Sequence, residues 1–329
     1  MKERFFLVLK GMAMGMAEVV PGVSGGTIAF ITGIYEELLN TIKGVTPGKL
    51  LIWKEEGLKA FWQSINGNFI LFLLIGMATG LVLGVFTIAK VLNTYPVLVW
   101  SFFFGLILAS VLYVGRQIKK WGIVEVALLV FSAGFSYYIT IAAPSQGPQD
   151  LWFVFISGFI AICALMLPGV SGSFLLLLLG MYQYIVTDNV KALLSDFNTS
   201  SLTVVIVFGL GCLAGLLSFS RVLSWTFKKF EYPTLAALTG FLLGSLNKVW
   251  PWKHVEQIYV KHLGEIDEEV VVIVEKSVMP AQHDSFIREG ANIIAYEAAD
   301  NYLIVALMMM MFGFLLLWGM ERFGSKKEA

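Results

Sequence analysis

The sequence is poor in charge, cysteine and histidine. Only 14% of the 329 residues are charged, the formal net charge is zero, and there are two cysteines and three histidines. A net charge of zero gives no electrostatic reason to expect a nucleic-acid partner. Cys163 and Cys212 both lie in apolar segments, so we expect small buried side chains rather than a disulfide. Because 57% of the residues are hydrophobic, the composition indicates an integral membrane protein.

Further absences argue against an enzyme and against an ATP-driven pump. No histidine lies in an apolar segment, no set of nucleophile, base and acid is recognisable, and there is no Walker-type glycine loop. The three histidines, His254, His262 and His283, fall in one polar segment with a spacing that fits no metal template. We therefore expect neither a metal site nor a cofactor.

What the sequence does contain is a repeat. The pentapeptide Pro-Gly-Val-Ser-Gly occurs at residues 21–25 and again at 168–172, and residues flanking it also match at the same offset. The matched flanking pairs are Ala17 with Ala164, Gly33 with Gly180, and Tyr35 with Tyr182. So long a period indicates a duplicated half rather than a solenoid. We expect a first membrane repeat at 1–143 and a second at 144–329.

Each copy of the motif interrupts an apolar run. Proline removes a backbone donor and glycine frees the chain to turn, so Pro21, Gly22, Pro168 and Gly169 are the expected breaks. Each run restarts near Ser24 or Ser171, and each half-run of about 15 residues is shorter than the roughly 20 needed to span a bilayer. Two half-length helices predict a re-entrant hairpin in each repeat. The hairpins are expected at 5–20 with 22–39 and at 151–167 with 169–186, with their tips in contact.

The restarting helices predict an anion site. A helix begins with free N–H groups and a positive dipole end, and the motif adds hydroxyl groups. The expected phosphate-binding residues are Ser24, Gly25, Gly26, Thr27, Ser171, Gly172 and Ser173. The alternative is that the motif is only a packing kink. A kink does not by itself need a serine, and both copies have one, which favours the functional interpretation.

Basic residues predict the topology. Spans are expected at 66–92, 96–114, 121–142, 201–227 and 301–319, and a further span is expected to follow Tyr232-Pro233. Arg116, Lys119 and Lys120 mark the cytoplasmic side, which also places both termini there. The acidic insertion at 251–299, with an expected strand over 270–274, is then extracytoplasmic. Three spans separate the hairpins, so the repeats are inverted. The expected fold is an all-α integral membrane protein whose repeats each combine a hairpin with three transmembrane helices, as in secondary transporters.

Few ionisable residues interrupt the apolar segments. Glu18 lies deep in the first hairpin, where an acid is a functional candidate, and its counterpart in the repeat is Leu165. We expect Glu18 to carry a proton, because burial away from water disfavours the charged carboxylate. Arg221 is either a partner of the substrate or a side chain reaching the interface. Glu36 and Lys248 are secondary candidates, for which a solvated position is the simpler interpretation.

Four segments resemble the signatures of the family catalogued as domain of unknown function 368. They are residues 18–27 (Glu-Val-Val-Pro-Gly-Val-Ser-Gly-Gly-Thr) with 33–35, residues 167–173 (Leu-Pro-Gly-Val-Ser-Gly-Ser) with 180–182, residues 220–225 (Ser-Arg-Val-Leu-Ser-Trp), and residues 244–252 (Gly-Ser-Leu-Asn-Lys-Val-Trp-Pro-Trp). The resemblance covers nearly the whole chain outside 253–299. It implies an acid at Glu18 and functional basic residues at Arg221 and Lys248. It implies nothing for the insertion.

The resemblance also implies a function. Members of the family are implicated in returning undecaprenyl phosphate, the lipid carrier of cell-wall synthesis, from the outer to the inner leaflet of the prokaryotic cytoplasmic membrane. The expected partners are therefore a polyprenyl-phosphate lipid, the bilayer and protons. The alternatives are a transporter of a small water-soluble anion and a membrane lipid-phosphate phosphatase. The sequence gives no oligomeric state.

Overall fold

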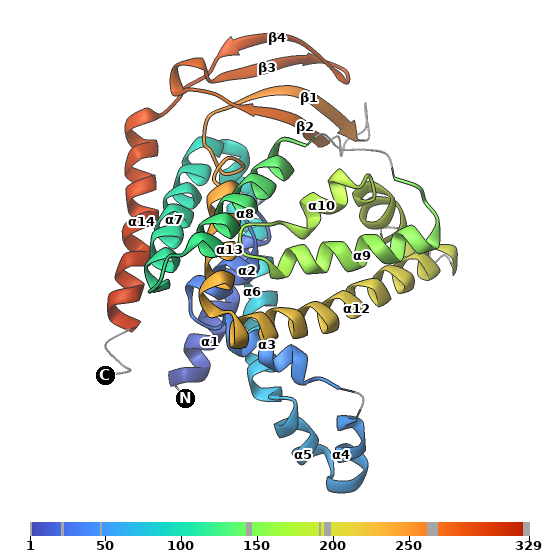
Figure 1. Cartoon of the computed structure of the whole chain (residues 1–329). Helices are drawn as coiled ribbons and strands as arrows, with labels where there is room; N and C mark the ends of the chain where they lie inside the picture. Colours follow the sequence, from blue (N-terminus) through green and yellow to red (C-terminus); the bar gives the residue numbers. More distant parts are fainter. Residues whose placement is uncertain are drawn as a thin grey trace.

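The chain is a bundle of helices with a small β-structure at one end (Figure 1), described here from a computed structural model. The structure describes residues 2–20, 23–46, 48–142, 147–190, 192–193, 199–261 and 269–324. The expected breaks Pro21 and Gly22, and His262, lie outside the described residues. The other two breaks, Pro168 and Gly169, are described and buried.

The helices follow the repeat. In the first half they are α1 (Lys2–Ala17), α2 (Gly25–Ile31), α3 (Tyr35–Gly44), α4 (Lys49–Glu56), α5 (Leu58–Ser64), α6 (Gly67–Thr94), α7 (Pro96–Gln117) and α8 (Ile123–Ile141). In the second half they are α9 (Leu151–Met166), α10 (Gly172–Leu178), a π-helix (Gln183–Val190), α12 (Thr199–Lys229), α13 (Glu231–Ser245) and α14 (Leu303–Gly324).

Both predicted broken helices are present. α1 and α9 each end just before a copy of the motif, and α2 and α10 each begin one residue after its serine. The short helix in each copy is followed by a second turn at a matched glycine, Gly33 with φ of +73° and Gly180 with φ of +69°. These positive φ values favour glycine, because it has no Cβ to clash with the backbone. After Gly180 the chain bends by 109° between α10 and the π-helix.

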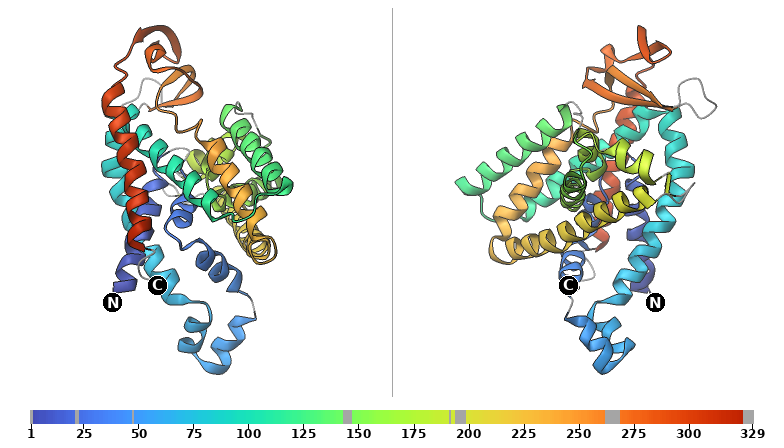
Figure 2. Two further views of the ribbon diagram at one scale, coloured as in Figure 1. Left: turned by 60° about the vertical axis from the view of Figure 1, so that its left-hand side comes forward. Right: turned by 90° about the vertical axis from the view of Figure 1, so that its right-hand side faces the viewer.

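Matched glycines bring equivalent helix pairs together in the two halves. Gly76 of α6 lies against the carbonyl of Val8 in α1, and Gly211 of α12 lies against the carbonyl of Phe155 in α9. Small residues at these positions allow the paired helices to approach closely. Two further pairs each join one helix from each half, with Gly105 of α7 against α14 and Gly240 of α13 against α8. The α9–α12 pair runs across the direction of α6 and α14 in both Figures 1 and 2.

Among the residues that the structure describes, four helices are long and apolar enough to cross a membrane: α6, α7, α8 and α12. They coincide with the predicted spans at 66–92, 96–114, 121–142 and 201–227. Of the two other predicted spans, the one after Tyr232-Pro233 corresponds to α13, which has 15 residues, and the one at 301–319 lies largely within α14, which has 22 residues. The bent pair of α10 and the π-helix would count as a fifth crossing if it is taken as one segment.

The insertion is a pair of β-hairpins. β1 (Lys253–Lys261) pairs antiparallel with β2 (Glu269–Ser277), and β3 (Asp284–Glu289) pairs antiparallel with β4 (Asn292–Ala298). The predicted strand at 270–274 lies within β2. The expectation of an all-α fold therefore holds for the bundle, and the insertion adds strands, as expected for 270–274. The run of β-branched residues at 270–274 favours a strand.

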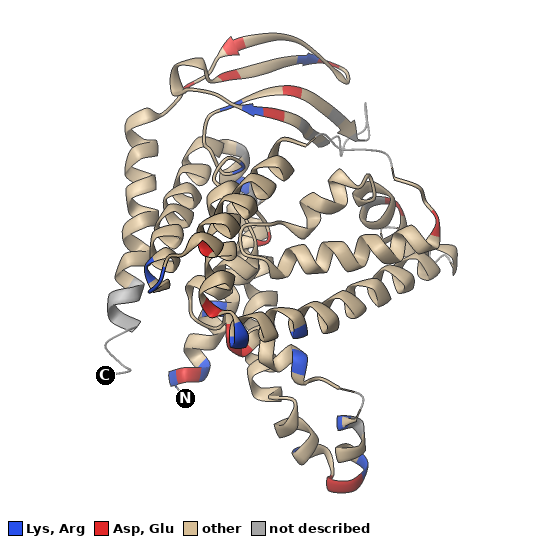
Figure 3. Ribbon diagram, viewed as in Figure 1, with Lys and Arg blue, Asp and Glu red and all other residues tan. Residues whose placement is uncertain are grey.

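The two ends of the molecule differ in composition. The β-hairpins lie at one end, and the beginning of α1, the end of α14 and the helices α4 and α5 lie towards the other (Figure 1). Lys and Arg residues of α1, α3, α4, α7 and α12 gather towards this second end (Figure 3). Trp53 on α4 is exposed, as is typical of a helix that lies at a membrane interface.

Candidate functional site

The two copies of the motif meet at their tips. The amide of Gly169 donates to Thr27 Oγ1 at 2.9 Å, and Ser24 Oγ donates to the carbonyl of Leu165 at 3.0 Å. A third bond runs from the Tyr35 hydroxyl to the carbonyl of Met166 at 2.6 Å. Segments more than 130 residues apart in the sequence are thus joined by three hydrogen bonds, and the tips are in contact as the sequence predicts.

These bonds complete a helix end. The last carbonyls of a helix have no partner within the helix and need one from elsewhere. Leu165 and Met166 close α9, and their carbonyls accept from side chains of the first copy. Ser24 and Thr27 are almost fully buried. In this structure the first tip is therefore enclosed by protein.

The two motif serines are helix caps. Ser24 Oγ accepts from the amide of Gly26 at 3.1 Å, and Ser171 Oγ accepts from the amide of Phe174 at 3.4 Å. Both serines have extended backbone and precede the first residue of α2 or α10. Serine is preferred at this position because its hydroxyl pairs a free amide. The inference that a kink needs no serine is therefore wrong, because each serine has a structural role in its turn.

Glu18 gives the first copy an acceptor that the second copy lacks. The amide of Gly25, the first residue of α2, donates to Glu18 Oε1 at 2.6 Å. A carboxylate is well placed at a helix start, because it faces free N–H groups and the positive dipole end. Leu165 stands at the equivalent position of the second copy, where Gly172 begins α10. The side chain of Leu165 offers no acceptor to that amide.

The second copy instead presents hydroxyl groups near a lysine. Ser171 Oγ and Ser173 Oγ are 3.0 Å apart, and Ser173 is exposed. The next residue, Phe174, carries Lys248 Nζ over its ring at 4.6 Å from the centroid. A cation over an aromatic face is held by the ring quadrupole. The structure thus brings the secondary candidate Lys248 to the second copy.

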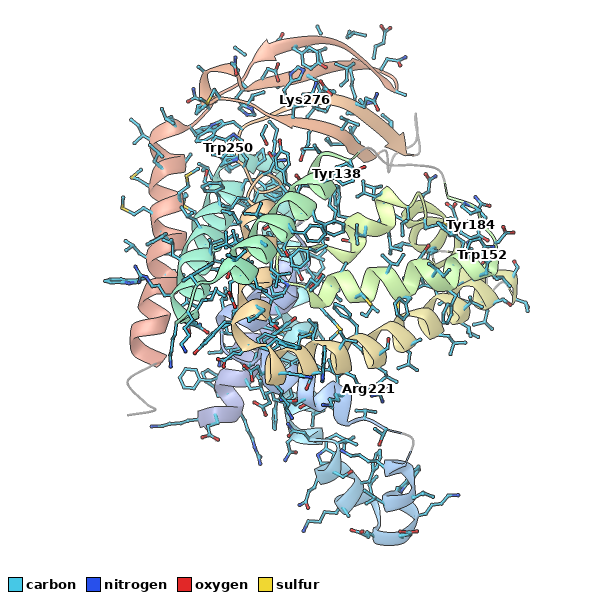
Figure 4. The ribbon with its side chains drawn as sticks, viewed as in Figure 1. Tyr138, Trp152, Tyr184, Arg221, Trp250 and Lys276 are labelled. Atoms are coloured by element: carbon cyan, nitrogen blue, oxygen red, sulfur yellow. The ribbon has the colours of Figure 1, made fainter. Side chains whose placement is uncertain are left out.

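Arg221 and Glu36 are not brought to the tips. Arg221 is exposed on α12, and Figure 4 shows its side chain on the side of that helix facing away from α10. Its neighbour along the helix face, Ser224, donates to Asn40 Oδ1 at 3.0 Å and accepts from Lys43 Nζ at 3.3 Å. Glu36 is exposed in the first turn of α3.

Other features of the described chain do not form a second polar site within the bundle. A surface groove of about 830 Å³ runs along the start of α8 and is apolar; its lining residues are Trp121, Gly122, Ile123, Val126, Ala127, Val130 and Phe131. No cluster of three metal-ligating side chains occurs among the described residues. His254 Nδ1 lies 2.8 Å from Asp284 Oδ2, and His283 Nδ1 lies 3.0 Å from the carbonyl of Lys253.

Sequence comparison decides the family. Residues 14–267 match the model of the VCA0040-like family, described as undecaprenyl phosphate translocase-like. The chain belongs to this family. The family resemblance noted in the sequence is thereby confirmed, and the four long apolar helices make this member a multi-pass membrane protein.

Two relatives are named as transporters. A polyprenyl-phosphate transporter of Vibrio cholerae is 40% identical over 318 residues, covering 97% of this chain and 96% of the relative. A polyprenyl-phosphate transporter of Staphylococcus aureus is 31% identical over 261 residues, covering 74% of this chain and 85% of the relative. No solved structure matches the chain at a significant level.

The sequence does not predict which side chains join the two tips. Tyr35 matches Tyr182 in the repeat, and Thr27 is an expected phosphate ligand. Neither pattern indicates that these side chains bind the backbone of the other copy. The contact partner of Lys248 on β2, Glu275, lies in the insertion to which no role was assigned.

Proposed function

We propose that this protein is a flippase that returns undecaprenyl phosphate from the outer to the inner leaflet of the prokaryotic cytoplasmic membrane. The returned lipid would serve again as the carrier of cell-wall synthesis. The proposal is supported by the names of two relatives, one of them similar over nearly its whole length. It is also supported by the paired broken helices, since secondary transporters bind substrate between such elements in inverted repeats.

The inverted arrangement is part of this proposal. Equivalent helix pairs, α1 with α6 and α9 with α12, pack through matched glycines in the two halves. The remaining pairs exchange helices between the halves, as a two-fold relationship requires. Both termini are proposed to be cytoplasmic and the β-hairpins extracytoplasmic, in line with the Lys and Arg residues that gather towards the end away from the hairpins (Figure 3).

The phosphate is proposed to bind first at the second copy of the motif. The observation that supports this is the difference between Glu18 and Leu165. In the first copy the carboxylate of Glu18 accepts a hydrogen bond from the amide of Gly25, whereas Leu165, at the equivalent position of the second copy, has no carboxylate. The hydroxyls of Ser171 and Ser173 and the backbone of Gly172 would hold the phosphate. Lys248, over Phe174, would add positive charge. Ser24, Gly25, Gly26 and Thr27 would complete the site only after the tips separate.

Glu18 is proposed to couple transport to protons. Moving an anionic lipid inward opposes the membrane potential, at about 2.3 kcal/mol per charge per 100 mV. A proton carried inward on Glu18 offsets one such charge. Protonation also weakens the charge-assisted bond from the Gly25 amide, because a neutral carboxyl is a poorer acceptor than a carboxylate. The first tip would then be able to accept the phosphate. Arg221, at the predicted cytoplasmic side, would meet the head group as it leaves.

A transporter of a small water-soluble anion is the second candidate, because nothing in the Ser171–Ser173 site itself requires a prenyl chain. A lipid-phosphate phosphatase is the third and is disfavoured by the absence, among the described residues, of a recognisable nucleophile with a base. Flux of a prenyl phosphate against flux of a short organic anion in liposomes separates the first two. Release of phosphate from the lipid identifies the third.

The test is movement of a prenyl phosphate in proteoliposomes by the wild type and by Ser173→Ala and Ser171→Ala variants. We expect at least a tenfold loss of rate for Ser173→Ala with an unchanged melting temperature, because Ser173 caps no helix. Ser218→Ala is the matched control, since that hydroxyl bonds to Ala214 within α12. A wild-type rate for both Ser171→Ala and Ser173→Ala contradicts the phosphate site.

A further inference from the structure

The inference concerns three charged side chains where the β-hairpins meet the helices. Glu275 Oε1, on β2, lies 2.9 Å from Lys248 Nζ and 3.8 Å from Lys253 Nζ. The side chains of Lys248, Lys253 and Glu275 are only 15%, 11% and 20% exposed. Two ammonium groups thus share one carboxylate in a largely buried position. The cluster keeps an excess of one positive charge.

A hydrogen-bonded frame fixes this cluster in place. Lys253 Nζ donates to the carbonyl of Asn247 at 2.7 Å and to Ser277 Oγ at 3.0 Å. Asn247 in turn donates from Nδ2 to Thr140 Oγ1 on α8 at 2.7 Å. Polar groups from α8, the segment after α13, β1 and β2 therefore converge on it. Such a hydrogen-bonded frame holds the charged groups in position.

The pKa values of Lys253 and Glu275 are shifted by burial and by the neighbouring charges. Burial lowers the pKa of Lys253 to about 8, an effect that Glu275 opposes and Lys248 reinforces. Burial alone would raise the pKa of Glu275, but Lys248 and Lys253 outweigh it and hold that pKa below its usual value. Glu275 is therefore ionised at neutral pH. The site carries a cation excess that a further anion would relieve.

One of the two lysines connects this cluster to the motif. Lys248 Nζ touches Glu275 on one side and lies 4.6 Å from the ring centroid of Phe174 on the other. Phe174 directly follows Ser173 in the second copy. An anion that takes Glu275's place on Lys248 is thereby positioned next to the exposed serine.

We propose that Lys248 and Lys253 form a receiving site for a phosphomonoester at the β-hairpin end of the molecule, and that Glu275 occupies this site until the phosphate displaces it. The proposal rests on the proposed function for the identity of the ligand. A phosphate dianion balances the two lysine charges fully, whereas the single carboxylate balances one. Lysines bind phosphate as point charges and so accept the exchange without a fixed geometry. The insertion would thus supply a built-in competitor for the substrate head group.

The experiment is titration of the full-length protein in detergent with geranyl phosphate, a short prenyl monophosphate, at neutral pH. Removal of the competitor in Glu275→Gln is expected to tighten binding about tenfold. Lys253→Met is expected to weaken it by a similar factor. In a Lys248→Met/Lys253→Met background, Glu275→Gln should change nothing, because there is no site left to release. Glu256→Gln is the matched control. It removes a carboxylate from the same sheet, and that carboxylate pairs with Lys276 at 2.5 Å.

The outcomes separate this inference from the proposed function. If the wild type binds and moves prenyl phosphate but Glu275→Gln binds it like Glu256→Gln, the receiving site is wrong and the proposed function stands. If Glu275→Gln tightens the binding of inorganic phosphate as much as that of geranyl phosphate, the site is supported and the lipid is not its specific ligand. If Glu275→Gln weakens binding at a wild-type melting temperature, Glu275 supports the ligand and the exchange is contradicted.

Discussion

Thr27 accepts a hydrogen bond from the amide of Gly169, so a side chain beside the first copy of the motif binds the turn of the second copy. Gly169 has φ of +84°, and a Cβ there would meet the backbone of Phe241 in α13. The second tip is thus held between Thr27 and α13. Thr27 is almost fully buried, so the first tip is closed to solvent while this hydrogen bond is in place. The proposed binding of phosphate by both tips requires that bond to break.

Replacing Thr27 by valine tests the bond with little change of shape. The Gly169 amide would be left buried without a partner, which costs about 1–3 kcal/mol. We expect a lower melting temperature in detergent for Thr27→Val. Thr203→Val is the control, because the Thr203 hydroxyl bonds only within α12, to the carbonyl of Thr199. Equal melting temperatures for the two variants would show that Thr27 does not hold the tips together.

Matched glycines give a test of the repeat. Gly76→Ala and Gly211→Ala each place a Cβ against a backbone carbonyl of the paired helix, Val8 in one half and Phe155 in the other. Overpacking of this kind costs about 1–3 kcal/mol. We expect both variants to lose stability by similar amounts in a thermal unfolding assay. Gly209→Ala is the control, since a Cβ there meets no atom within 4 Å. A loss confined to one of the matched variants would contradict equivalent packing.

Neutralising Glu18 tests the proton coupling. Glu18→Gln keeps an oxygen that can accept from the Gly25 amide, and it resembles the protonated acid. We expect geranyl phosphate to bind with nearly unchanged affinity, while transport in proteoliposomes loses its dependence on an imposed pH gradient. The matched control is Glu3→Gln, in the first turn of α1. A variant that still responds to the gradient like the wild type would move the proton-carrying role to Glu36.

Lys253 predicts a pH dependence of stability. Its pKa falls from 10.5 to about 8 on folding, so between these values the folded protein binds fewer protons than the unfolded chain. Stability must then rise with pH across this window, by about 1.4 kcal/mol per unit of pKa difference. Below pH 8 the full cost of the buried charge remains. We expect the melting temperature of the wild type to increase relative to that of Lys253→Met as pH rises from 8 to 10.5.

Fluorescence of Trp250 and Trp252 is the readout for this comparison, because both indole N–H groups bond to backbone near the β-hairpins. Lys276→Met is the control, since the Lys276 side chain is largely exposed and its charge is not buried on folding. A constant difference between the wild type and Lys253→Met across the window would mean that the Lys253 amine is not perturbed.

Local chemistry in the sequence predicted much of the backbone. The starts of α2 and α10 near Ser24 and Ser171 followed from the Pro-Gly breaks before them, because proline removes a backbone donor and glycine frees the chain to turn. Small residues at matched positions, such as Gly76 and Gly211, allow the close approach of helices that the structure shows. The strand β2 followed from a run of valines. Each of these features depends on residues close together in the sequence or on the repeat.

The contacts between distant segments could not be predicted. A threonine or tyrosine hydroxyl has many possible acceptors, and only the folded chain selects Gly169 for Thr27 and Met166 for Tyr35. Substitution of Gly172 by valine illustrates the limit. From the sequence it removes only access to an amide, but the structure places a Cβ there against the carbonyl of Ala161. Such a variant disturbs the packing of α9 and α10, so serine variants are the sharper test of binding.

The exchange of helices between the halves has a consequence for how the chain assembles. α7 pairs with α14, and α13 pairs with α8, so each half keeps two helices whose partners belong to the other. A chain cut between α8 and α9 would leave both fragments with uncovered glycine faces. They should therefore accumulate only when coexpressed.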